Sequence, residues 1–461
     1  MSAISTRRFA QSLPKLSCLS LIGQTRSYAV PAARKTAPSS ATTTNSFKPK
    51  KKRKEGRKLP SGPPSYKPMP VNQLTNSIFK TDQRVELQLP VFSPEVMKES
   101  SVGKALAFPT SQNEALRAFG VPDSILRDFR VLSRPCSVIR DVTVRSFDVL
   151  DAASNKSSRD TRLVMTGPSG CGKSYLLLQM VEYATHSNWI VLYVSRGVKL
   201  VDSSSDYTYD ARTQTYLQPE YSDQLLRRFL SVNEQLIRDL KTGEAHALED
   251  GTVPAGTPLV NLVKAGAEKP GNAPLVLAAL MNELSQQTQY PVLLAVDDIQ
   301  ALYGYSTYRD LHYRQLMAQH LAIPRMILEF ASGRKAFPRG AVIGAEGTQN
   351  TTFRMPVELR EALGLPEMRP AGPYTKRSPE IVEFARGIKN FPVPPRITIG
   401  EAASLFEVWM QDKALHSGEV RVESESRCAP NDELFMSKYA ESDGNARAFI
   451  WNGLLATQST L

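Results

Sequence analysis

Residues 163–174 run Leu163-Val164-Met165-Thr166-Gly167-Pro168-Ser169-Gly170-Cys171-Gly172-Lys173-Ser174. The first four residues are typical of a short buried strand, and the residues that follow the stretch, as far as Tyr183, place leucine, methionine and valine at helical spacing. A glycine-rich turn between a buried strand and a helix N-terminus is the pattern of a phosphate-binding loop, because its backbone N–H groups converge on an anion. The stretch therefore predicts an α/β fold that binds a nucleoside triphosphate or diphosphate.

Each residue type in this loop suits a different part of the predicted ligand. Gly167 and Gly172 have no Cβ, so the backbone can turn around the phosphate oxygens. We expect Lys173 to reach the β- and γ-phosphates and the Ser174 hydroxyl to ligate Mg²⁺. A chance glycine-rich turn is the alternative. The predicted nucleotide contacts in this stretch are Gly167, Pro168, Ser169, Gly170, Cys171, Gly172, Lys173, Ser174 and Tyr175.

A second apolar run, at 291–298, ends in the carboxylates Asp297 and Asp298. A strand buried on both faces of a parallel sheet is apolar throughout, and its carboxyl end opens on the phosphate site. We therefore expect Asp297 to hold the Mg²⁺ together with Ser174. Asp298 stands where motor ATPases carry a water-activating glutamate, and its shorter side chain predicts little or no turnover. The alternative for Asp298 is a helix cap.

A third apolar run, at 340–345, leads into the polar segment 346–350. In P-loop proteins with an additional strand, a polar residue at this place senses the γ-phosphate. Thr348 or Gln349 could fill that role, and a plain loop is the alternative.

The chain between Lys173 and Asp297 is longer than one strand–helix–strand unit needs, so an insert at about 200–275 is expected. Within it, 221–240 is predicted to be an amphipathic helix, and 251–271 is rich in turn-forming residues. The insert is expected to face a partner, and a surface elaboration is the alternative. Further helices are predicted at 275–288 and 310–332.

The net charge of +12 belongs to the N-terminal tail. Residues 1–58 contain 14 lysines and arginines and a single acidic residue, Glu55, so the rest of the chain has a net charge of −1. Any strong attraction for polyanions is therefore expected to lie in this polar tail.

The tail has two parts with different predicted roles. Residues 1–28 contain arginines, many hydroxyl residues and no acid, which is typical of a mitochondrial transit peptide cleaved after Tyr28. The cluster at 48–58 would neutralise RNA phosphates without reading bases, in a salt-dependent way. It also resembles a nuclear localisation signal, which leaves a nuclear protein as an alternative. No stretch approaches the roughly 20 apolar residues of a membrane span.

The predicted fold is an α/β P-loop NTPase of AAA+-like type, with a parallel sheet, a small helical C-terminal domain and a disordered or extended basic N-terminal arm. Helices are expected at 399–411, 432–440 and 445–456, and the segment 134–140 is expected near the base. The predicted organisation is a transit peptide at 1–28, a basic and proline-rich extended arm at 29–112, a P-loop nucleotide-binding domain at 113–365, a linker at 366–398 and a helical lid domain at 399–461.

Three features together resemble one family. The loop at 167–174, the Asp297–Asp298 strand end and Gly444-Asn445-Ala446-Arg447 are similar to the death-associated protein 3 family, whose members are mitochondrial small-subunit ribosomal proteins with an AAA+-related P-loop domain. The resemblance covers roughly residues 120–461. It implies that Arg447 contacts a phosphate from the lid; a solvated arginine at a helix start is the alternative.

The resemblance also implies a location and partners. The chain would be a structural component of the ribosomal small subunit in the mitochondrial matrix, supporting translation. Its partners would be small-subunit ribosomal RNA and ribosomal proteins, with bridge contacts to the large subunit as a further possibility and no membrane. The alternatives are a matrix AAA+ motor ATPase that assembles into rings and a nuclear replication-initiator-like ATPase.

The identity of the base stays open. The family is described as GTP-binding, but the chain has no Asn-Lys-x-Asp guanine-reading motif, since Asn155-Lys156-Ser157-Ser158 lacks the aspartate. The expected cofactors are therefore GTP/GDP or ATP, with Mg²⁺.

Overall fold

The computed structural model describes residues 87–111, 113–248, 251–366, 376–412, 414 and 432–455. These residues all belong to one compact unit, Leu59–Leu461; a second unit comprises Met1–Lys58. The predicted transit peptide, the basic cluster and most of the predicted arm lie outside the described residues.

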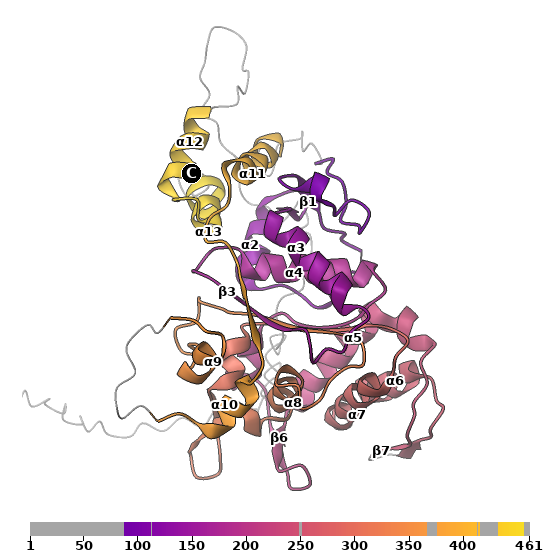
Figure 1. Cartoon of the computed structure of the whole chain (residues 1–461). Helices are drawn as coiled ribbons and strands as arrows, with labels where there is room; N and C mark the ends of the chain where they lie inside the picture. The colour runs from indigo at the N-terminus through magenta and orange to yellow at the C-terminus, as the bar shows by residue number, and fades with distance from the viewer. Residues whose placement is uncertain are drawn as a thin grey trace, which may run out of the picture. The chain divides into compact units, whose positions relative to one another are not determined.

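A five-stranded parallel sheet forms the centre of the described fold (Figure 1). Its strand order is β13-β3-β12-β9-β4. The bounds are β3 (Arg162–Thr166), β4 (Ile190–Val194), β9 (Val292–Asp297), β12 (Gly340–Ala345) and β13 (Lys389–Pro392). The predicted parallel sheet is therefore confirmed, and the strands predicted beside the loop, at 291–298 and at 340–345 are β3, β9 and β12.

Helices cover both faces of the sheet because side chains alternate along each buried strand. In β9, Leu293 and Ala295 belong to the core under α3 (Asp141–Ala153) and α4 (Lys173–His186). Leu294 and Val296 belong to the opposite core, under α5 (Pro219–Arg238), α6 (Leu259–Glu268), α7 (Ala273–Gln286) and α8 (Ala322–Ala331). Figure 1 shows α3 and α4 on one side of the sheet and α6, α7 and α8 on the other.

The region between β4 and β9 contains more regular structure than expected. The predicted amphipathic helix at 221–240 is confirmed as α5, and the predicted helix at 275–288 as α7. The segment 251–271, expected to consist of turns, contains β8 (Gly251–Val253) and α6. The other elements are η4 (Gly197–Leu200), the hairpin of β5 (Thr208–Asp210) and β6 (Thr215–Leu217), and β7 (His246–Leu248), which pairs with β8.

The helix predicted over 310–332 is wrong in its first half. A hairpin of β10 (Tyr305–Arg309) and β11 (Gln315–Met317) stands there, followed by η6 (Ala318–His320) and α8. Burial alternates residue by residue along β10, which is strand periodicity. At the turn, the Asp310 carboxylate accepts from the backbone N–H groups of His312 and Arg314, at 2.8 Å each, which favours the turn over a helix.

The described end of the expected N-terminal arm is packed rather than extended. Phe92 and Phe108 are buried, and their stacked rings lie 4.4 Å apart between centroids. β1 (Ala105–Ala107) pairs antiparallel with β2 (Cys136–Val138). The remaining N-terminal elements are η3 (Glu99–Ser101), α1 (Ala115–Ala118) and α2 (Asp123–Val131).

Regular structure also occurs inside the segment 366–398, which was expected to be a linker. It contains α10 (Pro379–Ala385) and the edge strand β13, after α9 (Val357–Ala362). β13 was missed because it is short and partly exposed. The side-chain oxygen Oδ1 of its Asn390 accepts from the Thr166 hydroxyl at 2.6 Å. The domain boundaries given above remain predictions.

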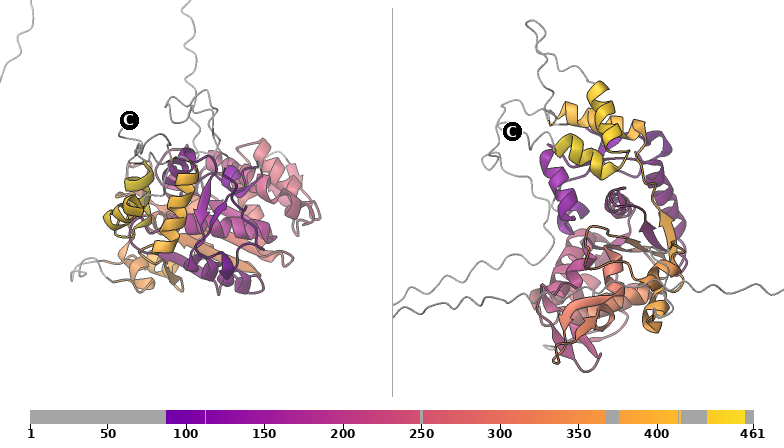
Figure 2. Two further views of the ribbon diagram at one scale, coloured as in Figure 1. Left: turned by 90° about the horizontal axis from the view of Figure 1, so that it is seen from above. Right: turned by 90° about the vertical axis from the view of Figure 1, so that its left-hand side faces the viewer.

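The C-terminal helices pack against the N-terminal part of the described chain. They are α11 (Ile399–Gln411), α12 (Asp432–Glu441), α13 (Ala446–Ile450) and the π-helical turn η7 (Trp451–Leu455), which agree with the predicted helices. Trp409 and Phe449 stack at 5.0 Å in a core that also includes Leu87 and Val138. Figure 2 shows these gold and yellow helices next to the indigo N-terminal segment. Among the described residues, no helix has the length and apolar character to cross a bilayer.

Candidate functional site at the glycine-rich loop

A cavity of about 280 Å³ lies where β3, β9 and β12 end. The loop after β3, the carboxylates after β9, the segment after β12 and the C-terminal helices all contribute to its wall. Nine of the twelve predicted site residues line it: Gly170, Cys171, Gly172, Lys173, Ser174, Tyr175, Asp297, Asp298 and Arg447. The other three, Gly167, Pro168 and Ser169, lie in the same loop and contact the lining residues through hydrogen bonds.

The glycines give the loop a backbone that other residues rarely adopt. Gly170 and Gly172 have φ angles of 83° and 97°, in the left-handed region. Gly172 is the N-cap residue of α4, so the first N–H groups of the helix, which have no partner within it, belong to residues that line the cavity. A helix start of this kind favours an anion.

Lys173 is buried although it carries a charge. Its Nζ donates to the carbonyl oxygens of Gly167 at 2.6 Å and Pro168 at 2.9 Å. These two carbonyls satisfy the ammonium group and hold it under the loop, beside the cavity that it lines. The cation is thus placed for an anion in the cavity.

Two adjacent carboxylates form the opposite wall. Burial is the main cause that raises the pKa of Asp297, and the neighbouring Asp298 carboxylate raises it further. The Ser174 hydroxyl and the backbone N–H of Asp298 bond to Asp297 and oppose the shift. Burial also raises the pKa of Asp298, against the effect of the Arg196 guanidinium. A buried pair of this kind needs a proton or a cation between its members.

The segment after β12 is fixed against these carboxylates. Gln300 pins it twice: its Nε2 donates to the Gly347 carbonyl at 2.8 Å, and its Oε1 accepts from the Gly347 N–H at 2.9 Å. A Cβ on Gly347 would lie 1.6 Å from Asp298 Oδ1, so only glycine allows this approach. Thr348 and Gln349 both line the cavity, as expected for the proposed sensor position.

The C-terminal helices dock directly on the glycine-rich loop. Asn445 Nδ2 donates to the Ser169 carbonyl at 2.8 Å, and the Arg447 N–H donates to the Gly170 carbonyl at 3.0 Å. The Arg447 guanidinium donates to Ser169 Oγ at 3.2 Å. Asn445 also caps α13 by accepting from the Ala448 N–H at 3.1 Å. The Gly-Asn-Ala-Arg element therefore contacts the glycine-rich loop, and the phosphate contact of Arg447 remains a prediction.

Arg140 also connects the glycine-rich loop to the C-terminal part of the chain. Its guanidinium donates to the Cys171 carbonyl at 2.9 Å, to the Arg396 carbonyl at 2.9 Å and to Glu401 at 3.3 Å. Glu401 lies in the first turn of α11 and completes a capping box with Thr398. One side chain thus bridges the loop and the first C-terminal helix. The sequence placed 134–140 near the site but gave no signal for this bridging role.

Three further residues at the cavity had no sequence signal, Arg127 and Asp128 of α2 and Trp451 of η7. The Tyr175 hydroxyl donates to Asp128 of α2 at 2.9 Å, and burial raises the pKa of Asp128 to about 6. The guanidinium carbons of Arg127 and Arg447 lie 5.8 and 6.0 Å from the ring centroid of Trp451. These side chains and their partners come from α2, α4, α13 and η7, so only the folded chain brings them together.

A smaller, mostly apolar cavity of about 80 Å³ adjoins the loop on the side of β2. Gly172 and Tyr175 line both cavities. The remaining wall includes Val138, Leu405 and Trp409. The segment 134–140, expected near a base, supplies part of this wall.

The fold and the site define a mixed α/β protein whose glycine-rich strand–loop–helix unit and paired carboxylates meet under a docked group of C-terminal helices. Comparison with known proteins points the same way. The profile of the family described as mitochondrial ribosomal death-associated protein 3 matches residues 137–451. This range includes the glycine-rich loop and the residues Asn445 and Arg447 that contact it.

Three relatives share the name small ribosomal subunit protein mS29. The Neurospora crassa protein is 28% identical over 327 residues, which cover 68% of this chain and 69% of the relative. The Schizosaccharomyces pombe protein is 24% identical over 355 residues, covering 76% and 71%. The Bos taurus protein is 22% identical over 261 residues, covering 55% and 65%.

The chain belongs to the mitochondrial ribosomal death-associated protein 3 family. This membership confirms the family resemblance read from the sequence motifs and the predicted mitochondrial location.

Proposed function

We propose that this chain is a structural component of the mitochondrial ribosomal small subunit and that its P-loop NTPase domain holds a purine nucleotide with Mg²⁺. The observation that carries the nucleotide part is the convergence of the glycine-rich loop, Lys173, the Asp297–Asp298 pair and Arg447 on one cavity. In this proposal the loop N–H groups, Lys173 and Arg447 bind the phosphates. GTP/GDP and ATP all fit this chemistry.

The carboxylate pair supports a bound magnesium ion. Ser174 and Asp297 already lie within hydrogen-bonding contact, and a hydroxyl and a carboxylate are the ligand types that Mg²⁺ takes beside phosphate oxygens. A divalent cation would also stabilise the two carboxylates against the burial that raises both pKa values, and against the Asp298 charge that raises the pKa of Asp297 further. Asp298 would then stay outside the first coordination sphere, against Gly347.

The apolar cavity beside the loop is the proposed place of the base. Gly172 and Tyr175 line both cavities, whereas Asp297 and Asp298 line only the larger one, so a nucleotide that spans both cavities would keep its base away from the carboxylates. The lining of the smaller cavity is mainly apolar, which suits the faces of a purine ring. We propose slow or absent hydrolysis, since Asp298 is fixed in a left-handed backbone conformation and closely packed by Gly347.

The ribosomal part of the proposal rests on the family and on the names of the relatives. The partners proposed for this chain are small-subunit ribosomal RNA and ribosomal proteins, with large-subunit bridge contacts as a further prediction. In domain terms, 113–365 would bind the nucleotide and 399–461 would act as its lid. Membership of this family favours the ribosomal function over a ring-forming motor ATPase or a nuclear initiator ATPase.

Nucleotide binding can be tested on the purified full chain by titrating GTP, GDP and ATP with Mg²⁺ in a calorimeter. Lys173→Ala should abolish binding, because it removes the cation under the loop. The matched control is Lys199→Ala. Lys199 Nζ lies 2.9 Å from Asp202 Oδ2, and neither residue lines the cavity. Equal nucleotide affinity in the wild type and Lys173→Ala, or no binding of any of the three nucleotides to the wild type, would refute the proposed ligand.

A further inference from the structure

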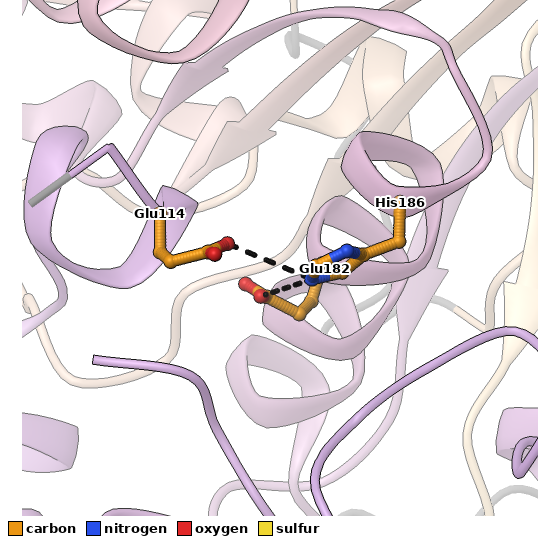
Figure 3. A group of neighbouring side chains, drawn as sticks. All are labelled: Glu114, Glu182 and His186. Carbon is orange, nitrogen blue, oxygen red and sulfur yellow. Dashed lines mark hydrogen bonds and ion pairs between the residues drawn. The ribbon is translucent and has the colours of Figure 1, made fainter. Parts of the chain in front are cut away.

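Three potential metal ligands converge at the far end of α4 (Figure 3). Glu182 and His186 lie one helical turn apart on α4, and Glu114 is the residue that precedes α1. His186 Nε2 lies 3.2 Å from Glu182 Oε1 and 3.6 Å from Glu114 Oε2. The three ligand atoms all lie within 4.8 Å of one another.

The arrangement is incomplete as a set of hydrogen bonds. His186 Nε2 carries at most one hydrogen, so it can donate to only one of the two carboxylates at a time. Glu182 is fully buried, and its Oε2 has no hydrogen-bond partner among the described residues. A buried carboxylate oxygen without a donor or a cation is costly. This unsatisfied atom is a second sign, besides the cluster itself, that a further cation belongs at this place.

The spacing of the atoms suits a small transition-metal ion. Zinc bonds of about 2.0 Å to nitrogen and oxygen in a tetrahedron place neighbouring ligands about 3.3 Å apart. The distances from His186 Nε2 to Glu182 Oε1 and Glu114 Oε2, 3.2 and 3.6 Å, bracket that value. An imidazole ligand favours zinc over Mg²⁺ and Ca²⁺, which prefer oxygen ligands in larger number.

We propose that Glu114, Glu182 and His186 form a zinc site, with a water molecule as the fourth ligand. The ion can enter from solvent, because the side chains of His186 and Glu114 are 30% and 22% exposed. In this proposal Oε2 of Glu114, Nε2 of His186 and both carboxylate oxygens of Glu182 bind the metal, so that Glu182 Oε2 gains a partner. Glu114 Oε1 remains bonded to the Ser111 hydroxyl at 3.2 Å.

This zinc site differs from the proposed magnesium site in place and in role. Glu182 lies eight residues beyond Ser174 on α4, which is about 12 Å along the helix axis. The ion would tie the segment that begins α1 to the helix that starts at the glycine-rich loop. Its role would be structural, since the ligands come from two elements that otherwise meet by apolar packing.

The test uses the full chain, stripped with a chelator and titrated with ZnCl₂. Glu114→Gln should bind one equivalent of zinc fewer, or bind that equivalent at least about tenfold more weakly, than the wild type. His186→Ala should behave in the same way. Co²⁺ should give the wild type a tetrahedral visible spectrum that both variants lose. Glu114→Gln keeps the Ser111 contact and the side-chain volume, so it remains informative if His186→Ala does not fold.

The matched control is His246→Ala. His246 Nε2 also faces a buried glutamate, Glu283 Oε1, at 2.8 Å, but that carboxylate is already satisfied by the backbone N–H groups of Gly243 and Glu244. This variant should bind as much zinc as the wild type. Equal zinc binding and equal Co²⁺ spectra in the wild type, Glu114→Gln and His186→Ala would overturn the proposal and leave the cluster as an imidazolium held between two carboxylates.

Discussion

Replacing Gly170 by alanine should detach the C-terminal helices from the glycine-rich loop. A Cβ at this position would lie 2.3 Å from Asn445 Oδ1 and 2.9 Å from Arg447 Cβ, both far closer than atoms in contact. Asn445 must then move, which breaks its cap on Ala448 and its bond to the Ser169 carbonyl. The Arg447 N–H must also leave the Gly170 carbonyl.

The size of the effect follows from these lost contacts. A left-handed alanine costs about 1–2 kcal/mol, a lost N-cap about 1 kcal/mol, and each lost hydrogen bond about 1 kcal/mol. Gly170→Ala should therefore lower the free energy of unfolding by roughly 4–5 kcal/mol. Gly256→Ala is the control, because Gly256 has φ +84 and no described atom within 4 Å of an added Cβ. It should lose only the backbone term, about 1–2 kcal/mol.

Thermal unfolding without added nucleotide measures the difference between the two variants. About 3 kcal/mol should separate them, which is about 6 °C in Tm at roughly 2 °C per kcal/mol for a large folding unit. Hydrogen exchange should also speed up at the amides of α13 in Gly170→Ala alone. Equal losses of Tm in both variants, with unchanged exchange in α13, would refute the docked arrangement.

Three further changes test other parts of the account. Arg140→Met should lower the free energy of unfolding, measured by urea titration, by about 3–5 kcal/mol, because Glu401 stays buried without its cation. Adding Glu401→Gln should recover part of this loss. Strictly additive losses from the two substitutions would contradict the ion pair between them. Burial raises the pKa of Asp128 to about 6 in the folded chain. The protonated Asp128 carboxyl therefore stabilises the fold below about pH 4, and this stabilisation is lost as the pH rises through 6. Asp128→Asn stays neutral, so it should gain up to about 3 kcal/mol over the wild type between pH 4 and pH 7; an equal difference at both pH values in urea unfolding would contradict this. Deleting residues 48–58 should weaken RNA binding and flatten its salt dependence in filter binding, and an unchanged slope would remove the cluster from the RNA-binding account.

The sequence predicts those elements whose local pattern decides their structure. The strands at 292–297 and 340–345 are continuous apolar runs, and α11 begins at a capping box. These three elements can therefore be predicted without knowledge of distant residues. The hairpin at 305–317 has enough apolar residues to resemble a helix, and only its alternating burial reveals strands. β13 is too short and too polar to stand out, since it is defined by its pairing with β3.

The site divides in the same way. The glycine-rich loop and Asp297 carry motifs with fixed spacing, and Arg447 follows a recognisable Gly-Asn element. Arg140 and Asp128 carry no such signal, because their importance comes from partners 31 and 47 positions away in sequence. Contacts of this range arise where α2 and the start of α3 pack against the glycine-rich loop and α4, which local patterns do not encode.

The central claim is tested most directly on the protein in its own assembly. Mitochondrial lysate would be separated on a sucrose gradient, and the nucleotide released from the isolated chain would be identified by mass spectrometry. The account predicts sedimentation with the small ribosomal subunit and about one purine nucleotide per chain, retained without steady turnover. Sedimentation as a free ring with continuous hydrolysis, or small-subunit chains without nucleotide, would contradict it.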